Sequence, residues 1–181
     1  MITDQAIYSA IEYRKYNKLK YRFHSDINTF DAGLYPKHAQ LLLAGKKYRE
    51  RLFMAPNRVG KSDLGSFEVA LHASGLYADK WTGKRFDLTK SLIICVAGTT
   101  AQTTRDIIQQ KLLGSPNDIG SGMIPRSHVK RVLSKTGVPD AVAIAEIVNP
   151  LGTVNRIIFK SYDQGRPSFE GTAYDFIWMD E

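Results

Sequence analysis

Eight consecutive residues carry the residue types of a phosphate-binding loop: Ala55-Pro56-Asn57-Arg58-Val59-Gly60-Lys61-Ser62. The backbone N–H groups of such a loop, together with the N-terminus of the following helix, surround the β-phosphate of a nucleotide. Gly60 lets the backbone come close, Lys61 reaches the β- and γ-phosphate oxygens, and the Ser62 hydroxyl binds Mg²⁺. The consensus has glycine where this chain has Ala55, and the alternative interpretation is a surface Gly-Lys-Ser turn.

A second feature lies at the end of the last apolar run, residues 176–179, which is followed by Asp180 and Glu181. The run is typical of a buried strand, and parallel sheets bind their ligands at the carboxyl ends of strands. An aspartate there can hold Mg²⁺, and an adjacent glutamate can polarise the water that attacks the γ-phosphate. Together with the loop, the two acids indicate a nucleoside triphosphatase. They argue against a small-molecule kinase, which needs no water-activating carboxylate.

These residues require strands and helices that hold them in place. Apolar spacing predicts a strand over 51–54 before the loop and a helix over 62–74 after it, ending at Gly75. The alternation of strands and helices predicts parallel strands joined by crossovers. The other predicted elements are a strand over 91–96, helices over 4–22, 37–44 and 102–113, and a hairpin of 142–148 with 153–160.

Composition sets the class of protein. The 181 residues are 43% hydrophobic and 24% charged, which is typical of a globular chain, and no run is long enough to span a membrane. A single cysteine excludes a disulfide framework and favours a reducing, intracellular setting. Of the net charge of +7, residues 1–60 hold +6, from 11 basic and 5 acidic residues. The basic half of the first predicted helix is either a solvated face or a contact for DNA or another partner.

Other candidate residues have simpler explanations. The four histidines have no metal-ligand spacing, and Cys95 lies in an apolar strand as a core residue. Tyr77 and Trp81, near three basic residues, are either stacking platforms for nucleic acid or half-buried loop residues.

From about Tyr35 to its end, the sequence resembles the N-terminal ATPase portion of the tailed-phage terminase large subunit, the DNA-packaging motor. The resemblance rests on the order and spacing of several short segments: Pro36 with Gln40, Asn57-Arg58-x-Gly60-Lys61-Ser62, Thr103-Thr104-Arg105-Asp106, Leu112-Leu113-Gly114, 120–125, 159–166, Phe169-Glu170-Gly171 and 178–181.

The resemblance implies an α/β fold, a P-loop NTPase of the additional-strand catalytic-glutamate type. It implies an incomplete parallel-type sheet with a hairpin insertion and an N-terminal helical appendage. The expected domains are a basic appendage over 1–35 and an incomplete ATPase domain over 36–181, with the nuclease domain absent. In related proteins a strand from beyond the acidic pair lies at the centre of the sheet. Residues 1–181 alone are therefore expected to fold poorly and to hydrolyse ATP slowly, which a cooperative thermal melt would contradict.

The resemblance also implies roles for the site residues, with ATP and Mg²⁺ as cofactors. Lys61, Glu181 and Arg58 are the implied catalytic residues, and Ser62 and Asp180 the metal ligands. Gln40 either reads the adenine or is an exposed helix residue. Many terminases place the loop arginine one residue earlier, where this chain has Asn57. Arg166 either contacts phosphate or DNA or is a surface arginine. The implied nucleotide-binding set is Gln40, Pro56, Asn57, Arg58, Val59, Gly60, Lys61 and Ser62.

The implied function is the nucleotide-binding half of a motor that hydrolyses ATP to move double-stranded DNA into a procapsid. The implied partners are double-stranded DNA, the portal protein, the terminase small subunit and further copies in a ring, in the bacterial cytoplasm. Two alternatives stay open: a non-catalytic remnant or interaction module, and another P-loop DNA-dependent ATPase such as a helicase.

Overall fold

The computed structural model describes residues 4–21, 36–79 and 81–180, and within them a single five-stranded mixed sheet with the order β2-β3-β4-β1-β5. β1 lies between β4 and β5 and is parallel to both, whereas β2-β3 and β3-β4 are antiparallel pairs. The strands are β1 Ile93–Gly98, β2 Val129–Ser134, β3 Val142–Val148, β4 Val154–Ser161 and β5 Phe176–Met179.

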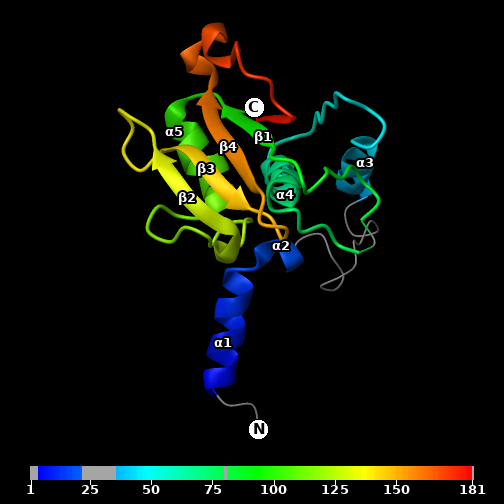
Figure 1. Ribbon diagram of the computed structural model, residues 1–181, viewed down its shortest axis with the longest axis vertical. Coiled ribbons are helices and arrows are strands. Elements are labelled where there is room, and N and C mark those ends of the chain that lie inside the picture. Colours follow the sequence, from blue (N-terminus) through cyan, green and yellow to red (C-terminus); the bar gives the residue numbers. More distant parts are fainter. Residues whose placement is uncertain (1–3, 22–35, 80, 181) are drawn as a thin grey trace.

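The helices were mostly predicted, with two differences. The expected helix over 4–22 is two helices separated by a turn at Tyr16 and Asn17, and Figure 1 shows the first of them projecting away from the sheet. The expected helix over 102–113 has a π-helical middle turn, a feature frequently found at functional sites. The elements are α1 Asp4–Lys15, α2 Lys18–Tyr21, α3 Pro36–Ala44, α4 Lys61–Ser74, α5 Ala101–Thr103, the π-helix η1 Thr104–Gln109 and α6 Gln110–Leu113.

Alternating burial along β4 shows how the layers pack. Asn155, Ile157, Phe159 and Ser161 are buried, while the residues between them are partly or fully exposed. The buried side joins Phe67 and Leu71 of α4 and Leu112 of α6 in one hydrophobic core.

Short 3₁₀ turns complete the connections: η2 Arg126–His128, η3 Tyr162–Gln164 and η4 Arg166–Phe169.

Two expectations about the sheet need correction. The sheet is mixed rather than of parallel type, because the predicted hairpin of β3 and β4 belongs to the same sheet, and β2, which was not predicted, extends it by a further antiparallel strand. The predicted strand over 51–54 was wrong: no strand is assigned there. Burial still alternates along this segment, with Leu52 80% and Met54 83% exposed, but a strand needs a hydrogen-bonding neighbour. In the described part of the chain β5 pairs with β1 alone.

No helix among the described residues is long and apolar enough to cross a membrane. The proposed boundary at Tyr35 and the basic residue Arg22 lie outside the described residues.

Candidate nucleotide-binding site

The loop from Ala55 to Ser62 leads directly into α4. Gly60 has a left-handed backbone, with φ of +83°, and occupies the position that caps the helix. Its carbonyl oxygen accepts the hydrogen bond from Leu64 N–H at 2.9 Å that starts α4, and no side chain caps this end of the helix. The uncapped N–H groups and the positive end of the helix dipole favour an anion at this position.

Arg58 is the one described residue within the loop, other than Gly60, with a left-handed backbone, at φ of +65°. For a residue with a side chain this conformation costs about 1 kcal/mol and is concentrated at ligand-binding segments. The Arg58 side chain is exposed, as are those of Pro56, Asn57 and Val59. The crown of the loop is therefore open to a ligand in solution.

Lys61 closes the loop. Its Nζ donates a hydrogen bond to the carbonyl oxygen of Ala55 at 2.9 Å, so the first turn of α4 is tied to the start of the loop. Ser62, which follows on the same turn, is half-buried. An ammonium group directed across a loop of backbone amides is an arrangement suited to the β- and γ-phosphates.

Helix α3 lies beside the loop through His38, which the sequence analysis considered only as a metal ligand. The His38 ring packs edge-on against Phe53 at 5.5 Å, and a Cβ built on Gly60 would lie 3.6 Å from His38 Cε1. Gln40 is exposed on the same helix. Its predicted role with adenine stays a prediction.

Helix α4 also contacts the strand that ends in the predicted acids. A Cβ built on Gly65 would lie 2.2 Å from Cε2 of Trp178, so the absence of a side chain at Gly65 makes room for the indole of β5. Two residues after Trp178, the Asp180 N–H donates to the Ala97 carbonyl oxygen of β1 at 2.9 Å. The structure thus brings the second turn of α4 against the strand that carries Asp180. Glu181 lies outside the described residues.

Tyr162 joins the ends of β1 and β5. Its hydroxyl lies 3.3 Å from the carbonyl oxygen of Ala97 and 3.4 Å from that of Asp180, and donates toward both. Burial and, secondarily, the charge of Asp180 raise the pKa of Tyr162, which keeps the hydroxyl protonated as a donor. Tyr162 lies in the segment 159–166 that contributes to the resemblance, and no role was predicted for it.

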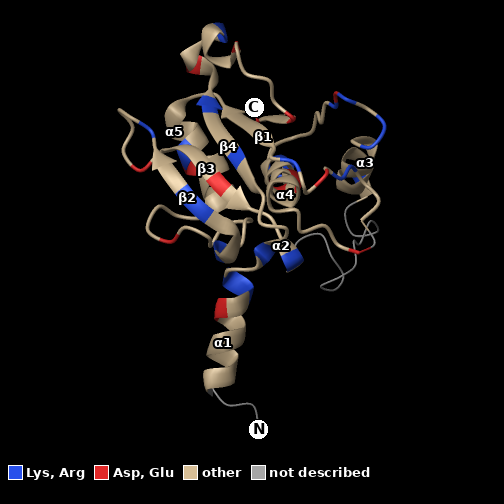
Figure 2. Cartoon of the chain, viewed as in Figure 1, with Lys and Arg blue, Asp and Glu red and all other residues tan. Residues whose placement is uncertain are grey.

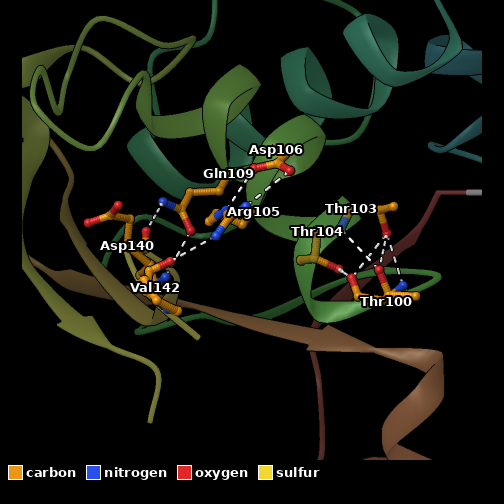
Figure 3. A network of polar contacts seen from close by, with 9 residues as sticks. Thr100, Thr103, Thr104, Arg105, Asp106, Gln109, Asp140 and Val142 are labelled. Atoms are coloured by element: carbon orange, nitrogen blue, oxygen red, sulfur yellow. Dashed lines mark hydrogen bonds and ion pairs between the residues drawn. The ribbon is translucent and has the colours of Figure 1, made fainter. Parts of the chain in front are cut away.

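The residues after β1 hold η1 against the hairpin (Figure 3). Thr100 and Thr103 form a reciprocal cap at the start of α5, and the Thr104 hydroxyl lies 3.1 Å from the Lys160 carbonyl oxygen. The Gln109 side chain donates to the Asp140 carbonyl oxygen and accepts from Val142 N–H, both at 2.8 Å. These contacts give the Thr103–Asp106 segment a structural role.

An ion pair connects α6 to the helix that follows the loop. Lys111 Nζ of α6 lies 2.6 Å from Asp63 Oδ1 in the first turn of α4, immediately after Ser62. Neither residue was selected from the sequence, where no pattern distinguishes this lysine from any other.

Arg51 anchors the segment that was predicted as a strand. Its guanidinium lies 2.9 Å from Glu68 Oε1 of α4 and donates to the Leu41 carbonyl oxygen of α3 at 2.8 Å. Beside this pair the buried His72 lies 3.6 Å from the same carboxylate oxygen, and its Nδ1 is 2.9 Å from Tyr77 Oη. Burial lowers the pKa of His72, whereas Glu68 opposes this effect. The cluster fixes α3, the loop approach and α4 relative to one another.

The structure also shows the surroundings of the other candidate residues. Within the described residues no group of three or more His, Cys, Asp or Glu side chains has metal-site geometry. Cys95 is buried, as predicted, and burial raises its pKa to about 11. Trp81 is 4% exposed and donates to the Lys84 carbonyl oxygen, so it belongs to the core. Arg166 is exposed and pairs with Glu170 at 2.8 Å, and both interpretations of this arginine stay open.

The family is decided by comparison with known sequences. The model described as "Terminase large subunit, T4likevirus-type, N-terminal" matches residues 52–181. The chain belongs to this family. The terminase large subunit of Salmonella phage P22 is similar to it, with 29% identity over 167 residues, covering 81% of this chain and 33% of the P22 protein. The terminase chain thus spans about a third of the length of this relative. No solved structure matches this chain.

The family assignment agrees with the resemblance to the terminase large subunit that the sequence motifs indicated. The matched range contains both the Ala55–Ser62 loop and Asp180, the two features from which the sequence analysis started.

Proposed function

We propose that this terminase chain binds MgATP at the Ala55–Ser62 loop and that ATP hydrolysis there drives DNA packaging. The observation that carries the proposal is the contact of Gly65 with Trp178, which joins the helix after the loop to the strand before Asp180. A loop with a lysine at its end and an acid on the adjacent strand form the two halves of an NTPase site.

The loop residues would hold the phosphates. Backbone N–H groups from Asn57 to Lys61 and the N-terminus of α4 surround the β-phosphate, and Lys61 exchanges its bond with the Ala55 carbonyl oxygen for phosphate oxygens. Arg58, exposed at the crown of the loop, neutralises charge that develops on the γ-phosphoryl oxygens.

The oxygen donors of Ser62 and Asp180 suit Mg²⁺, a hard cation that is typically held by one or two carboxylates together with substrate phosphates. When bound, the metal neutralises phosphate charge during phosphoryl transfer. Tyr162 fixes the backbone at Asp180 by donating to its carbonyl oxygen. Glu181 follows directly and would orient the attacking water.

In the complete motor, ATP turnover would move double-stranded DNA into a procapsid, with the portal protein, the terminase small subunit and further copies of the large subunit as partners. Gln40 on α3 would face the adenine. The partners are those of the whole motor, and this chain spans a third of the length of the P22 relative.

ATP turnover with a matched control tests the proposal. Phosphate release from MgATP is measured for the wild type, Lys61→Ala and Lys46→Ala, which removes an exposed lysine just after α3. We expect Lys61→Ala to lose turnover while Lys46→Ala keeps it. Equal turnover in all three proteins would contradict the assignment of the site.

A further inference from the structure

A hollow lies between the N-terminal helices, the first turn of α4 and α6. It encloses about 600 Å³. Arg14, Lys18 and Tyr21 form one wall, and Asp63, Lys111 and Met123 are part of the other. No residue of the Ala55–Ser62 loop lines it. The function proposed above does not use this space.

The charges around the hollow leave a positive excess. Asp63 is neutralised by Lys111 at 2.6 Å, and Asp106, also on its wall, by Arg105 at 2.7 Å. Arg14 and Lys18 have no carboxylate partner among the residues that the structure describes; Arg14 instead lies over the Tyr21 ring at 5.2 Å. Two exposed cations therefore face a space whose acids are already paired.

The wall that carries these cations is fixed to the body of the protein. Leu19 of α2 is 2% exposed and belongs to the hydrophobic core. Shortly before Leu19 in the chain, the Tyr16 hydroxyl donates a hydrogen bond to Asp118 at 2.9 Å. Asp118 also pairs with Lys15 at 2.5 Å and with Arg126 at 2.6 Å. These contacts lower the pKa of the Asp118 carboxyl, and the hydrogen bond from Lys15 is the main cause. The cations are thus held over the hollow rather than carried on a free tail.

We propose that this hollow is a contact site for the phosphodiester backbone of double-stranded DNA, with Arg14 and Lys18 as the phosphate-binding cations. The inference rests on the proposed function, which supplies DNA as the substrate. Figure 2 shows basic residues gathered where α1 meets α2. Two of them, Arg14 and Lys18, line the hollow, so a long polyanion can continue from it onto the neighbouring basic residues. The Tyr21 ring and Met123 offer apolar surface beside the sugar, and the guanidinium suits phosphate oxygens.

Lys111 connects this site to the nucleotide. Its ammonium lines the hollow and at the same time pairs with Asp63, the residue directly after Ser62. A DNA phosphate that attracts Lys111 weakens its hold on Asp63 and so perturbs the first turn of α4. By linkage, DNA and MgATP then alter each other's affinity by the same factor.

Fluorescence anisotropy of a short labelled DNA duplex, titrated with the 181-residue chain at several salt concentrations, tests the site. Each phosphate contact releases about one counterion from the DNA. Removing one such contact should therefore weaken DNA binding roughly tenfold and make the slope of log affinity against log salt shallower by about 0.9. We expect both effects for Arg14→Gln and for Lys18→Gln. Lys18→Arg keeps the positive charge and should bind DNA as the wild type does. Lys135→Gln, in the turn between β2 and β3, is the matched control and should bind as the wild type does.

Wild-type affinity and slope in both Arg14→Gln and Lys18→Gln would overturn the proposal. Displacement of the duplex by inorganic phosphate, at concentrations where sodium chloride of equal ionic strength has no effect, would assign the hollow to a free phosphate ligand instead. Circular dichroism of each variant confirms that the fold is kept. Lys61→Ala should keep DNA binding and lose MgATP, and the two hollow variants should do the reverse, which separates this site from the nucleotide site.

Discussion

The indole of Trp178 in β5 occupies the space that a side chain at Gly65 of α4 would need, with the built Cβ 2.2 Å from the ring atom Cε2. This contact connects the helix after the phosphate-binding loop to the strand that ends at Asp180. Close packing makes the relative position of the two elements sensitive to a single methyl group.

Gly65→Ala is expected to destabilise the protein by about 1–3 kcal/mol because the methyl group overpacks the Trp178 ring. At an exposed helix position the same change stabilises by roughly 0.5–1 kcal/mol, so the sign distinguishes the two situations. Urea denaturation followed by circular dichroism measures the difference.

Trp178→Phe provides the control, because the smaller ring leaves room for the methyl group. In that background Gly65→Ala should cost less than in the wild type, and a double-mutant cycle reports the difference as a coupling energy. An equal cost in both backgrounds would show that the two residues do not interact as described.

Tyr162→Phe is expected to weaken the response of nucleotide binding to Mg²⁺. The hydroxyl fixes the carbonyl oxygens of Ala97 and Asp180, so its loss frees the backbone at the proposed metal ligand. The Mg²⁺ concentration for half-maximal ATP binding should rise several-fold, while ATP binding in EDTA stays the same. Tyr174→Phe removes another tyrosine hydroxyl as the control, and an equal effect there would contradict a specific role for Tyr162.

Stability should fall in acid because of His72. Burial lowers its pKa in the folded state, so the unfolded chain takes up a proton first, near pH 6.5. The free energy of unfolding therefore decreases as the pH drops below about 6.5, with a slope of up to about 1.4 kcal/mol per pH unit from this group. Chemical denaturation between pH 7.5 and about pH 5 should show this slope in the wild type and a smaller one in His72→Gln. An equal slope in the wild type and in His72→Gln would contradict the assignment to His72.

Local patterns predicted much of the fold and the ends of several elements. Gly75 ends α4 in a left-handed conformation with its N–H bonded to the Leu71 carbonyl oxygen, as a C-terminal glycine predicts. The Asn149–Gly152 turn joins β3 and β4 as predicted, because the turn residues and the apolar runs on either side indicate the same hairpin. The apolar run before Asp180 is β5.

Local sequence patterns could not predict contacts between residues that lie far apart in the chain. Nothing near Gly65 in the sequence indicates that Trp178, which lies 113 positions later, fills the space beside it. The strand over 51–54 has the right alternation but no neighbouring strand, and Arg51 is instead drawn to Glu68 and the end of α3. β2 was missed because its residues, Val-Lys-Arg-Val-Leu-Ser, do not alternate between apolar and polar. Tyr162, Lys111 and His38 owe their places to tertiary packing alone.

The central claim is that the Ala55–Ser62 loop binds MgATP, and calorimetric titration of the purified chain tests it most directly. Lys61 makes charge-assisted bonds worth about 1.5–3 kcal/mol, so Lys61→Ala should weaken MgATP binding roughly 10- to 100-fold, while Lys46→Ala binds as the wild type does. MgATP binding by the wild type that Lys61→Ala leaves unchanged, or no binding by a wild type that melts cooperatively, would contradict the account.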